Sequence, residues 1–108
     1  MEQPNLTYIQ QLSGGDKAFE QKLLSVVIVE FPEEKGVYEG NMKNFAFAKA
    51  AENVHKLKHK FGILGLEKSY QIAIDYEEQL LKGEMGLRKD FESILQKIQE
   101  FLRTLSIE

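Results

Sequence analysis

Residues 45–65 have the sequence FAFAKAAENVHKLKHKFGILG, and this segment decides the fold. Its apolar side chains recur at steps of three and four residues, which places them on one face of a helix. Asn44 precedes the segment as a capping residue, and Gly65 supplies the glycine that commonly follows a helix. We therefore predict a helix from Phe45 to about Leu64 with a buried stripe of Phe47, Ala50, Val54, Leu57, Phe61 and Leu64.

The residues before this segment predict two earlier helices. Pro4 suits the first turn of a short helix that carries Leu6, Ile9 and Leu12. The glycines of Ser13-Gly14-Gly15-Asp16 end that helix, and Asp16 caps the next one. Residues 26–29 (VVIV) favour a strand locally, but no second run of this kind exists to pair with them, so we predict a helix there.

Pro32 lies within the second predicted helix and should kink or end it. Glu33-Glu34, Gly36 and Gly40-Asn41 then indicate a polar, loosely helical connection. Downstream, helices are predicted from about Glu67 to Lys82 and from Leu87 to about Leu105, with a tight turn at 83–86. Every predicted element is a helix, so the expected fold is all-α. Short connections place sequential helices antiparallel to one another. We therefore expect an antiparallel up-and-down four-helix bundle with a short extra N-terminal helix, in a single domain over residues 1–108.

Composition excludes several classes of function. The chain has 108 residues with 14 Lys plus Arg against 17 Asp plus Glu, and this net charge of −3 disfavours a dedicated nucleic-acid binder. It has no cysteine, which excludes disulfide scaffolds, thiol catalysis and cysteine-bound metals. No apolar stretch approaches the ~20 residues that span a bilayer, and the start Met-Glu-Gln-Pro does not resemble a secretory signal. We expect a cytoplasmic protein that binds neither membrane nor nucleic acid.

Both histidines of the chain, His55 and His59, lie one turn apart on the helix predicted over 45–64. Val54 and Leu57 are expected to face the core. His55 lies about 100° around the helix from Val54, at the edge of the apolar stripe or outside it. An imidazole in that position is available for chemistry near neutral pH.

The neighbours of His55 favour an accessible ring and an anionic partner. Ala48, Ala51 and Gly62 share its side of the helix and are too small to shield it. Residues 49–68 contain five lysines and two glutamates, an excess of three positive charges in a chain of net charge −3. Positive charge around an imidazole favours a phosphoryl group. The lysines expected to contribute are Lys49, Lys56, Lys58, Lys60 and Lys68.

Residues 55–58 (HKLK) followed by 61–66 (FGILGL) resemble the active helix of histidine-containing phosphotransfer (HPt) domains. That family's pattern is a histidine, any residue, Leu and Lys, often Gly, and then a Leu-Gly-Ala-like end. The resemblance extends more weakly to residues 12–31, to Tyr76-Glu77 and to the turn near Gly83-Glu84, so it covers most of the chain.

The resemblance implies a carrier in a two-component phosphorelay, not an autonomous kinase. His55 is the implied phospho-acceptor through Nε2, Lys58 the residue that stabilises the phosphoryl charge, and Glu77 the group that orients the other ring nitrogen. His59 stands where many members have glycine, which makes it a candidate modulator of access. The implied partners are response-regulator receiver domains and a hybrid histidine kinase. The chain needs no cofactor of its own, Mg²⁺ is expected on the receiver, and the chain is expected to be a monomer.

Two alternatives remain open at this point. His55 and His59, at positions i and i+4 of a helix, could share a metal ion with Glu52 as a third ligand, although the intervening lysines repel a cation. The chain could also be a structural or adaptor bundle that binds another helix through Tyr8, Phe45, Phe47 and the C-terminal helix.

Overall fold

The computed structural model describes residues 2–105, which form five helices and no strand. This confirms the all-α expectation, including a helix over residues 26–29. Asp16 caps the second helix as expected, because its carboxylate accepts a hydrogen bond from the amide of Phe19 at 3.2 Å. The helices are α1 (Thr7–Ser13), α2 (Lys17–Lys43), α3 (Phe47–Ile63), α4 (Glu67–Leu81) and α5 (Arg88–Leu105).

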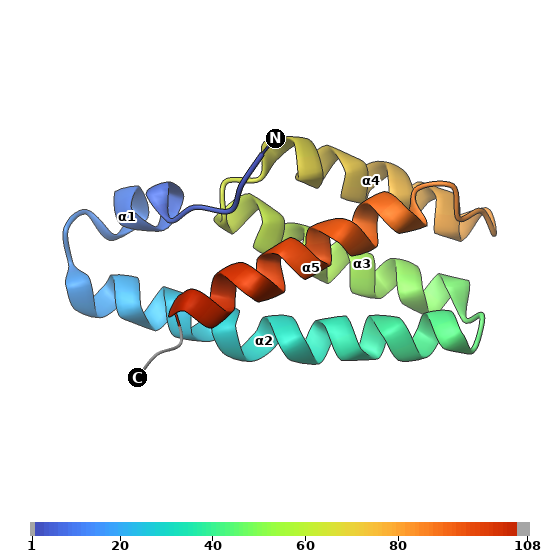
Figure 1. The fold of residues 1–108 in the computed structure, drawn as a ribbon, viewed down its shortest axis with the longest axis horizontal. Coiled ribbons are helices and arrows are strands. Elements are labelled where there is room, and N and C mark those ends of the chain that lie inside the picture. Colours follow the sequence, from blue (N-terminus) through green and yellow to red (C-terminus); the bar gives the residue numbers. More distant parts are fainter. Residues whose placement is uncertain (1, 106–108) are drawn as a thin grey trace.

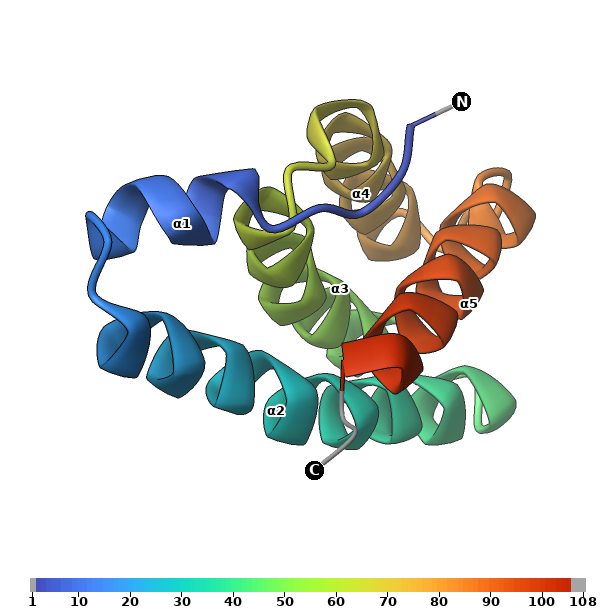
Figure 2. The same ribbon diagram turned by 60° about the vertical axis from the view of Figure 1, so that its left-hand side comes forward.

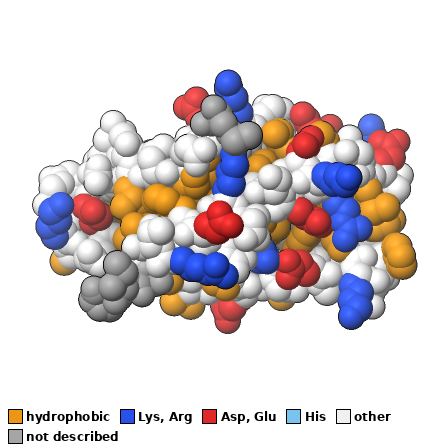
Figure 3. Space-filling model, in the orientation of Figure 1, with side chains coloured by type: hydrophobic (Ala, Val, Ile, Leu, Met, Phe, Trp, Pro, Cys, Tyr) orange, Lys and Arg blue, Asp and Glu red, His pale blue; other side chains and the backbone are white. Residues whose placement is uncertain are grey.

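The long helix α2 extends along one side of the molecule, and α3 returns beside it (Figure 1). α3 packs against both α2 and α4, and α5 packs against α4 and α2. The short α1 contacts α2, and in Figure 2 the segment before α1 crosses near the connection from α3 to α4. On the face shown in Figure 3, positive and negative side chains are interspersed with apolar ones, so this face has no extended basic patch.

The core lies where α2, α3, α4 and α5 meet. Aromatic rings fill its centre: Phe91 of α5 lies 5.3 Å from Tyr38, 5.5 Å from Phe61 and 5.0 Å from Tyr76, measured between ring centroids. Five of the six residues in the predicted stripe are completely buried, and the sixth, Phe47, packs against the same cluster. The three-and-four-residue spacing of α3 therefore identified its buried face correctly. The completely buried members of the stripe are Ala50, Val54, Leu57, Phe61 and Leu64, the last of which directly follows α3.

Pro32 was expected to kink or end the second helix, and the expectation that it ends there is wrong, because α2 runs from Lys17 to Lys43 with Pro32 inside it. Proline inside a helix removes a hydrogen bond and costs about 3 kcal/mol. The burial of Phe31 before it and of Tyr38 and Met42 after it, all in one core, offsets that cost. The proline itself is exposed. Residues 33–41, expected as a loose connection, are part of this helix.

Replacing Gly36 and Gly40 together with alanine is expected to stabilise the protein. A Cβ added at either position meets no atom within 4 Å, and both glycines lie inside α2. Each substitution should raise the free energy of unfolding by about 1 kcal/mol, because glycine loses more backbone freedom than alanine in a helix. Urea denaturation measures the gain.

Gly83→Ala is the matched control for this pair. Its Cβ also meets nothing within 4 Å, but the φ of Gly83 is +76°, so alanine is strained there and should destabilise the protein. Equal effects at all three glycines would contradict the continuous helix.

The turn between α2 and α3 differs from the expected capping. Asn44 ends α2 and does not cap α3, which begins at Phe47 without a side-chain cap. Phe45 takes a φ of 56°, in the left-handed region, and the amide of Ala46 bonds to the carbonyl of Asn41 at 2.8 Å. This is the hydrogen-bond pattern of a Schellman motif, with phenylalanine at the position where glycine is usual. The Phe45 ring is exposed and packs edge-on against Phe47.

The N-terminal segment fixes the start of α4. The carboxylate of Glu2 accepts hydrogen bonds from the amides of Lys68 (2.8 Å) and Ser69 (2.9 Å) and from the Ser69 hydroxyl (3.0 Å). Burial raises the pKa of Glu2, but these hydrogen bonds outweigh it and hold the pKa below its usual value. Glu2 thereby supplies the cap that Leu66 cannot provide at the N-terminus of α4.

None of the helices within residues 2–105 combines the length and the apolar character that crossing a membrane requires.

Candidate functional site

His55 lies in the middle of α3 with its side chain 53% exposed. Val54 and Leu57 on the same helix are completely buried and anchor this part of α3 in the core. The helix therefore holds the ring in place while leaving it accessible, as its position at the edge of the apolar stripe predicted. Ala51, expected beside the ring on the surface, is instead buried in the core.

Glu77 of α4 lies against one nitrogen of this ring. Its carboxylate oxygens are 3.2 Å and 3.4 Å from His55 Nδ1. The two residues are 22 positions apart in the sequence, and the packing of α4 against α3 brings them together. Glu77 is largely shielded, with its side chain 23% exposed, so the contact is a defined part of the α3–α4 interface.

Lys58 completes this group on α3. Its ammonium lies 3.4 Å from Glu77 Oε1, 3.3 Å from His55 Nδ1 and 5.7 Å from the centre of the Tyr70 ring. Its side chain is 12% exposed, so Lys58 is not the solvated lysine that a charged helix face suggests. It connects the ring and the carboxylate.

These contacts favour one tautomer of His55. A carboxylate only accepts hydrogen bonds, so Nδ1 can interact favourably with Glu77 only by donating a proton to it. Lys58 then donates to the same carboxylate, so that Glu77 accepts from both His55 and Lys58. If Nδ1 carried a lone pair instead, it would accept from Lys58 but face the negative Glu77 oxygens. The arrangement therefore leaves the free lone pair on Nε2.

Lys60 does not belong to this group, contrary to the expectation that it surrounds the histidine. It is buried on another side of α3, with its ammonium 2.9 Å from Glu30 and 3.4 Å from Glu34 of α2. Five residues along a helix correspond to about 140° of rotation, which turns Lys60 away from His55. Two of the five lysines expected to form a positive patch, Lys58 and Lys60, are thus paired with glutamates.

His59 lies one turn after His55 and is exposed. The two imidazole rings are 5.1 Å apart between centroids, at an interplanar angle of 66°. His59 also borders an open depression whose other lining residues are Tyr8, Gly62, Ile63 and Tyr70. A Cβ on Gly62 would meet the Tyr70 ring at 3.6 Å, an ordinary contact, so close packing does not require glycine here.

Tyr38, Tyr76 and Glu92 form a hydrogen-bonded group that is not apparent from the sequence. The hydroxyl groups of Tyr38 and Tyr76 are 2.7 Å apart, and Tyr38 donates to Glu92 of α5 at 2.8 Å. Burial raises the pKa of Tyr38 far above its usual value, and the hydrogen bonds to Tyr76 and Glu92 raise it further. Tyr76 directly precedes Glu77, so this contact between α2, α4 and α5 helps to fix the register of the helix that carries Glu77. Nothing in the local sequence marks Tyr38 and Glu92 as its partners.

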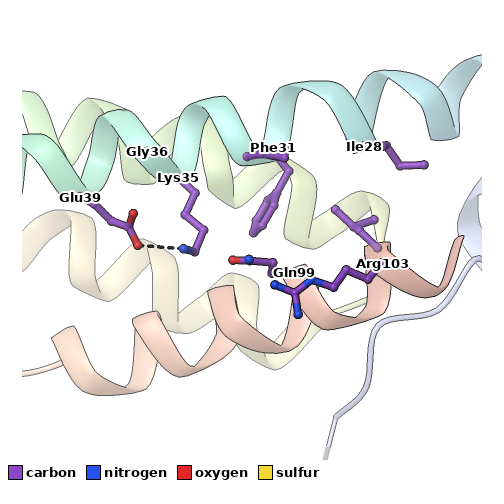
Figure 4. Close-up of a pocket in the computed structure, with 9 residues that line it drawn as sticks. Ile28, Phe31, Lys35, Gly36, Glu39, Gln99 and Arg103 are labelled. Carbon is purple, nitrogen blue, oxygen red and sulfur yellow. Dashed lines mark hydrogen bonds and ion pairs between the residues drawn. The ribbon is translucent and has the colours of Figure 1, made fainter. Parts of the chain in front are cut away.

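A groove of about 330 Å³ lies between α2 and α5 (Figure 4). Lys35 and Glu39 form an ion pair at 2.8 Å along it, and no residue of the histidine site borders it. It is lined by Ile28, Phe31, Pro32, Lys35, Gly36, Glu39, Gln99, Leu102 and Arg103.

The structure thus brings together His55, Lys58 and Glu77, with His59 beside them, and leaves Lys60 elsewhere. Glu52, considered as a third metal ligand, does not complete a metal site, because residues 2–105 contain no group of three or more His, Asp or Glu side chains that could hold an ion.

No protein-family model matches this chain, and no curated protein or solved structure matches it significantly.

Proposed function

We propose that this chain is a histidine phosphotransfer protein, which carries a phosphoryl group on His55 between the aspartates of receiver domains. The observation that carries the proposal is the asymmetric environment of the His55 ring: Nδ1 faces Glu77 and Lys58, and the ring remains half exposed. A nucleophile needs an accessible lone pair in a fixed position, and the half-exposed ring, with Nδ1 held against Glu77, offers Nε2 for that role.

The chemistry requires little more than alignment and charge compensation. The Nε2 lone pair forms a bond to the phosphorus of an aspartyl phosphate while the bond from phosphorus to the aspartate oxygen breaks, which releases the aspartate carboxylate. The phosphorylated ring, still protonated at Nδ1, gains positive charge directly beside Glu77. The reverse sequence delivers the phosphoryl group to a second aspartate. Mg²⁺ belongs to the receiver in this proposal, and the chain supplies no nucleotide site.

The surface beside His55 suits a docked receiver. The depression lined by Tyr8, His59, Gly62, Ile63 and Tyr70 is open, and it includes His59, whose ring centroid lies 5.1 Å from that of His55. Tyr8 contributes an exposed aromatic side chain to this depression, and half-buried Ile63 and Tyr70 line it as well. His59 borders the same depression, and in this proposal it modulates access there.

The proposal extends to the setting of the protein. α2 to α5 form an antiparallel up-and-down four-helix bundle, with α1 as the additional short helix. The chain acts as a cytoplasmic monomer between a hybrid histidine kinase and response-regulator receivers. Its HPt-like character rests on the resemblance of residues 55–66 together with the geometry around His55.

Incubation with phosphorylated receivers tests the function. Receiver domains from the same genome are phosphorylated with a labelled small-molecule donor and Mg²⁺, purified, and mixed with the chain. At least one receiver should transfer its label to the chain, in a form that is stable to alkali and labile to acid, as expected for phosphohistidine. A complete panel of active phospho-receivers that transfers nothing would contradict the proposal.

Replacing Lys58 with alanine is expected to slow phosphoryl transfer about tenfold, equivalent to about 1.4 kcal/mol, because the ammonium that lies 3.3 Å from the His55 ring and offsets incoming negative charge is lost. Rapid-quench transfer from a phospho-receiver measures the rate. Lys56→Ala is the matched control, since Lys56 is exposed one residue from His55 and removes the same charge from the same helix. If both variants slow transfer equally, general charge attraction acts in place of the contact between Lys58, His55 and Glu77.

A further inference from the structure

The two histidine rings have the spacing of a shared metal site. His55 and His59 are on one helix at positions i and i+4, both exposed, with ring centroids 5.1 Å apart. Two imidazoles bound to one tetrahedral ion at nitrogen–metal distances of about 2.0–2.1 Å place their centroids about 5 Å apart. The observed centroid separation equals that of such a pair, and binding further requires that one nitrogen of each ring turn toward the ion.

The contact with Glu77 is a second, independent feature of metal-binding histidines. Such a histidine generally donates its other ring N–H to a carboxylate, which fixes its tautomer and increases its basicity. His55 Nδ1 lies 3.2 Å from Glu77 Oε2, so Nε2 is left as the ligand atom. Glu77 is then an orienting group and not a ligand.

The sequence-based objection to a cation at this position is weakened by the structure. Lysines between the histidines were expected to repel a positive ion. Lys58, however, is paired with Glu77 at 3.4 Å, and Lys60 is buried against Glu30 and Glu34 on another side of α3. Only Lys56 remains as an exposed lysine within the segment 55–60.

We propose that His55 and His59 together bind one divalent transition-metal ion of the zinc type, and that the bound ion prevents phosphorylation of His55. The described residues offer no third protein ligand, so water completes the coordination, and the ion exchanges readily. The inhibitory part of the proposal rests on the proposed phosphotransfer function. The ion is a regulator here, since the transfer itself does not require it.

Competition for one pair of electrons explains the inhibition. The Nε2 lone pair of His55 forms the bond to phosphorus during transfer. In the metal site the same lone pair forms the bond to zinc, and a water molecule leaves the ion. The two states exclude each other, so phosphorylation should equally weaken zinc binding, as linkage requires.

Calorimetric titration with ZnCl₂ at neutral pH, in a buffer that does not chelate zinc, tests the site. The wild-type chain should bind one ion, and His59→Gln should weaken binding at least tenfold, since loss of an outer-shell partner alone costs about that much. Lys56→Gln, an exposed change on the same turn, should not weaken it. Absence of binding heat in the wild type, or equal affinity of His59→Gln, would overturn the proposal. Circular dichroism verifies that each variant is helical.

Transfer from a phospho-receiver, measured with and without ZnCl₂, tests the inhibition. The ratio of the two rates is compared between wild type and His59→Gln, so a change in the basal rate does not matter. Zinc should slow the wild type strongly and the variant much less. Equal inhibition of both would mean that zinc acts on the receiver, which overturns the regulatory part. A chain that binds zinc but accepts no phosphoryl group retains the site and loses the proposed function. A chain that accepts phosphate without binding zinc retains the proposed function and overturns the metal site.

Discussion

Replacing His55 with glutamine is expected to reduce phosphoryl acceptance from a phospho-receiver to background. Glutamine keeps a polar side chain of similar length but has no nucleophilic nitrogen, because its amide lone pair is delocalised. The His55 side chain is half exposed, so the free energy of unfolding should change by less than about 0.5 kcal/mol. Labelled transfer measures acceptance, and urea denaturation measures stability.

His59→Gln is the matched control, since it makes the same chemical change one turn away on the same exposed surface. This variant should still form acid-labile phosphohistidine, although its rate of transfer changes if His59 modulates access. If His55→Gln accepts the phosphoryl group and His59→Gln does not, the acceptor has been assigned to the wrong ring.

Replacing Phe91 with alanine is expected to have the largest effect on stability, a loss of about 3–5 kcal/mol. The Phe91 ring is completely buried and contacts rings of α2, α3 and α4, so its removal leaves a cavity that several helices border. Because a domain of this size is stable by about 5–15 kcal/mol in total, a large part of its stability depends on this one side chain.

Phe45→Ala gives the comparison for Phe91→Ala. It removes the same atoms from a ring that is 73% exposed and contacts Phe47. Its cost, measured by the same urea denaturation, should be smaller by at least about 2 kcal/mol, because little apolar surface returns to water. A similar loss in both variants would mean that Phe91 is not the centre of the core.

The helices could be predicted from the sequence because their apolar spacing is regular, but the length of α2 could not. Pro32 is a strong local signal against a helix. What overrides it is the burial of Phe31 and Tyr38 on the two sides of the proline, together with the pairing of Glu34 with Lys60 of α3. These are long-range contacts, and no window of sequence around Pro32 contains them. Tertiary packing here outweighs a local preference.

The candidate site, like the fold, could be predicted only in part, because some of its features depend on long-range contacts. The accessibility of His55 followed from its place beside the stripe of α3, and its resemblance to HPt domains indicated Lys58 and Glu77. Composition alone misjudged the charge around the ring, because it counted Lys58 and Lys60 toward a positive patch although both are paired with glutamates of other helices. Which glutamate meets which lysine depends on the register between helices. That register is fixed by core contacts such as the one between Tyr38 and Tyr76.

The most direct test of the central claim identifies the phosphorylated atom. The chain is labelled with ¹⁵N-histidine, phosphorylated by a phospho-receiver with Mg²⁺, and examined by ³¹P and ¹⁵N NMR. The expected result is one phosphohistidine, at His55, with phosphorus bonded to Nε2 and a proton on Nδ1 beside Glu77. Phosphorus on Nδ1 of His55, or on His59, would contradict the role assigned to the Glu77 contact.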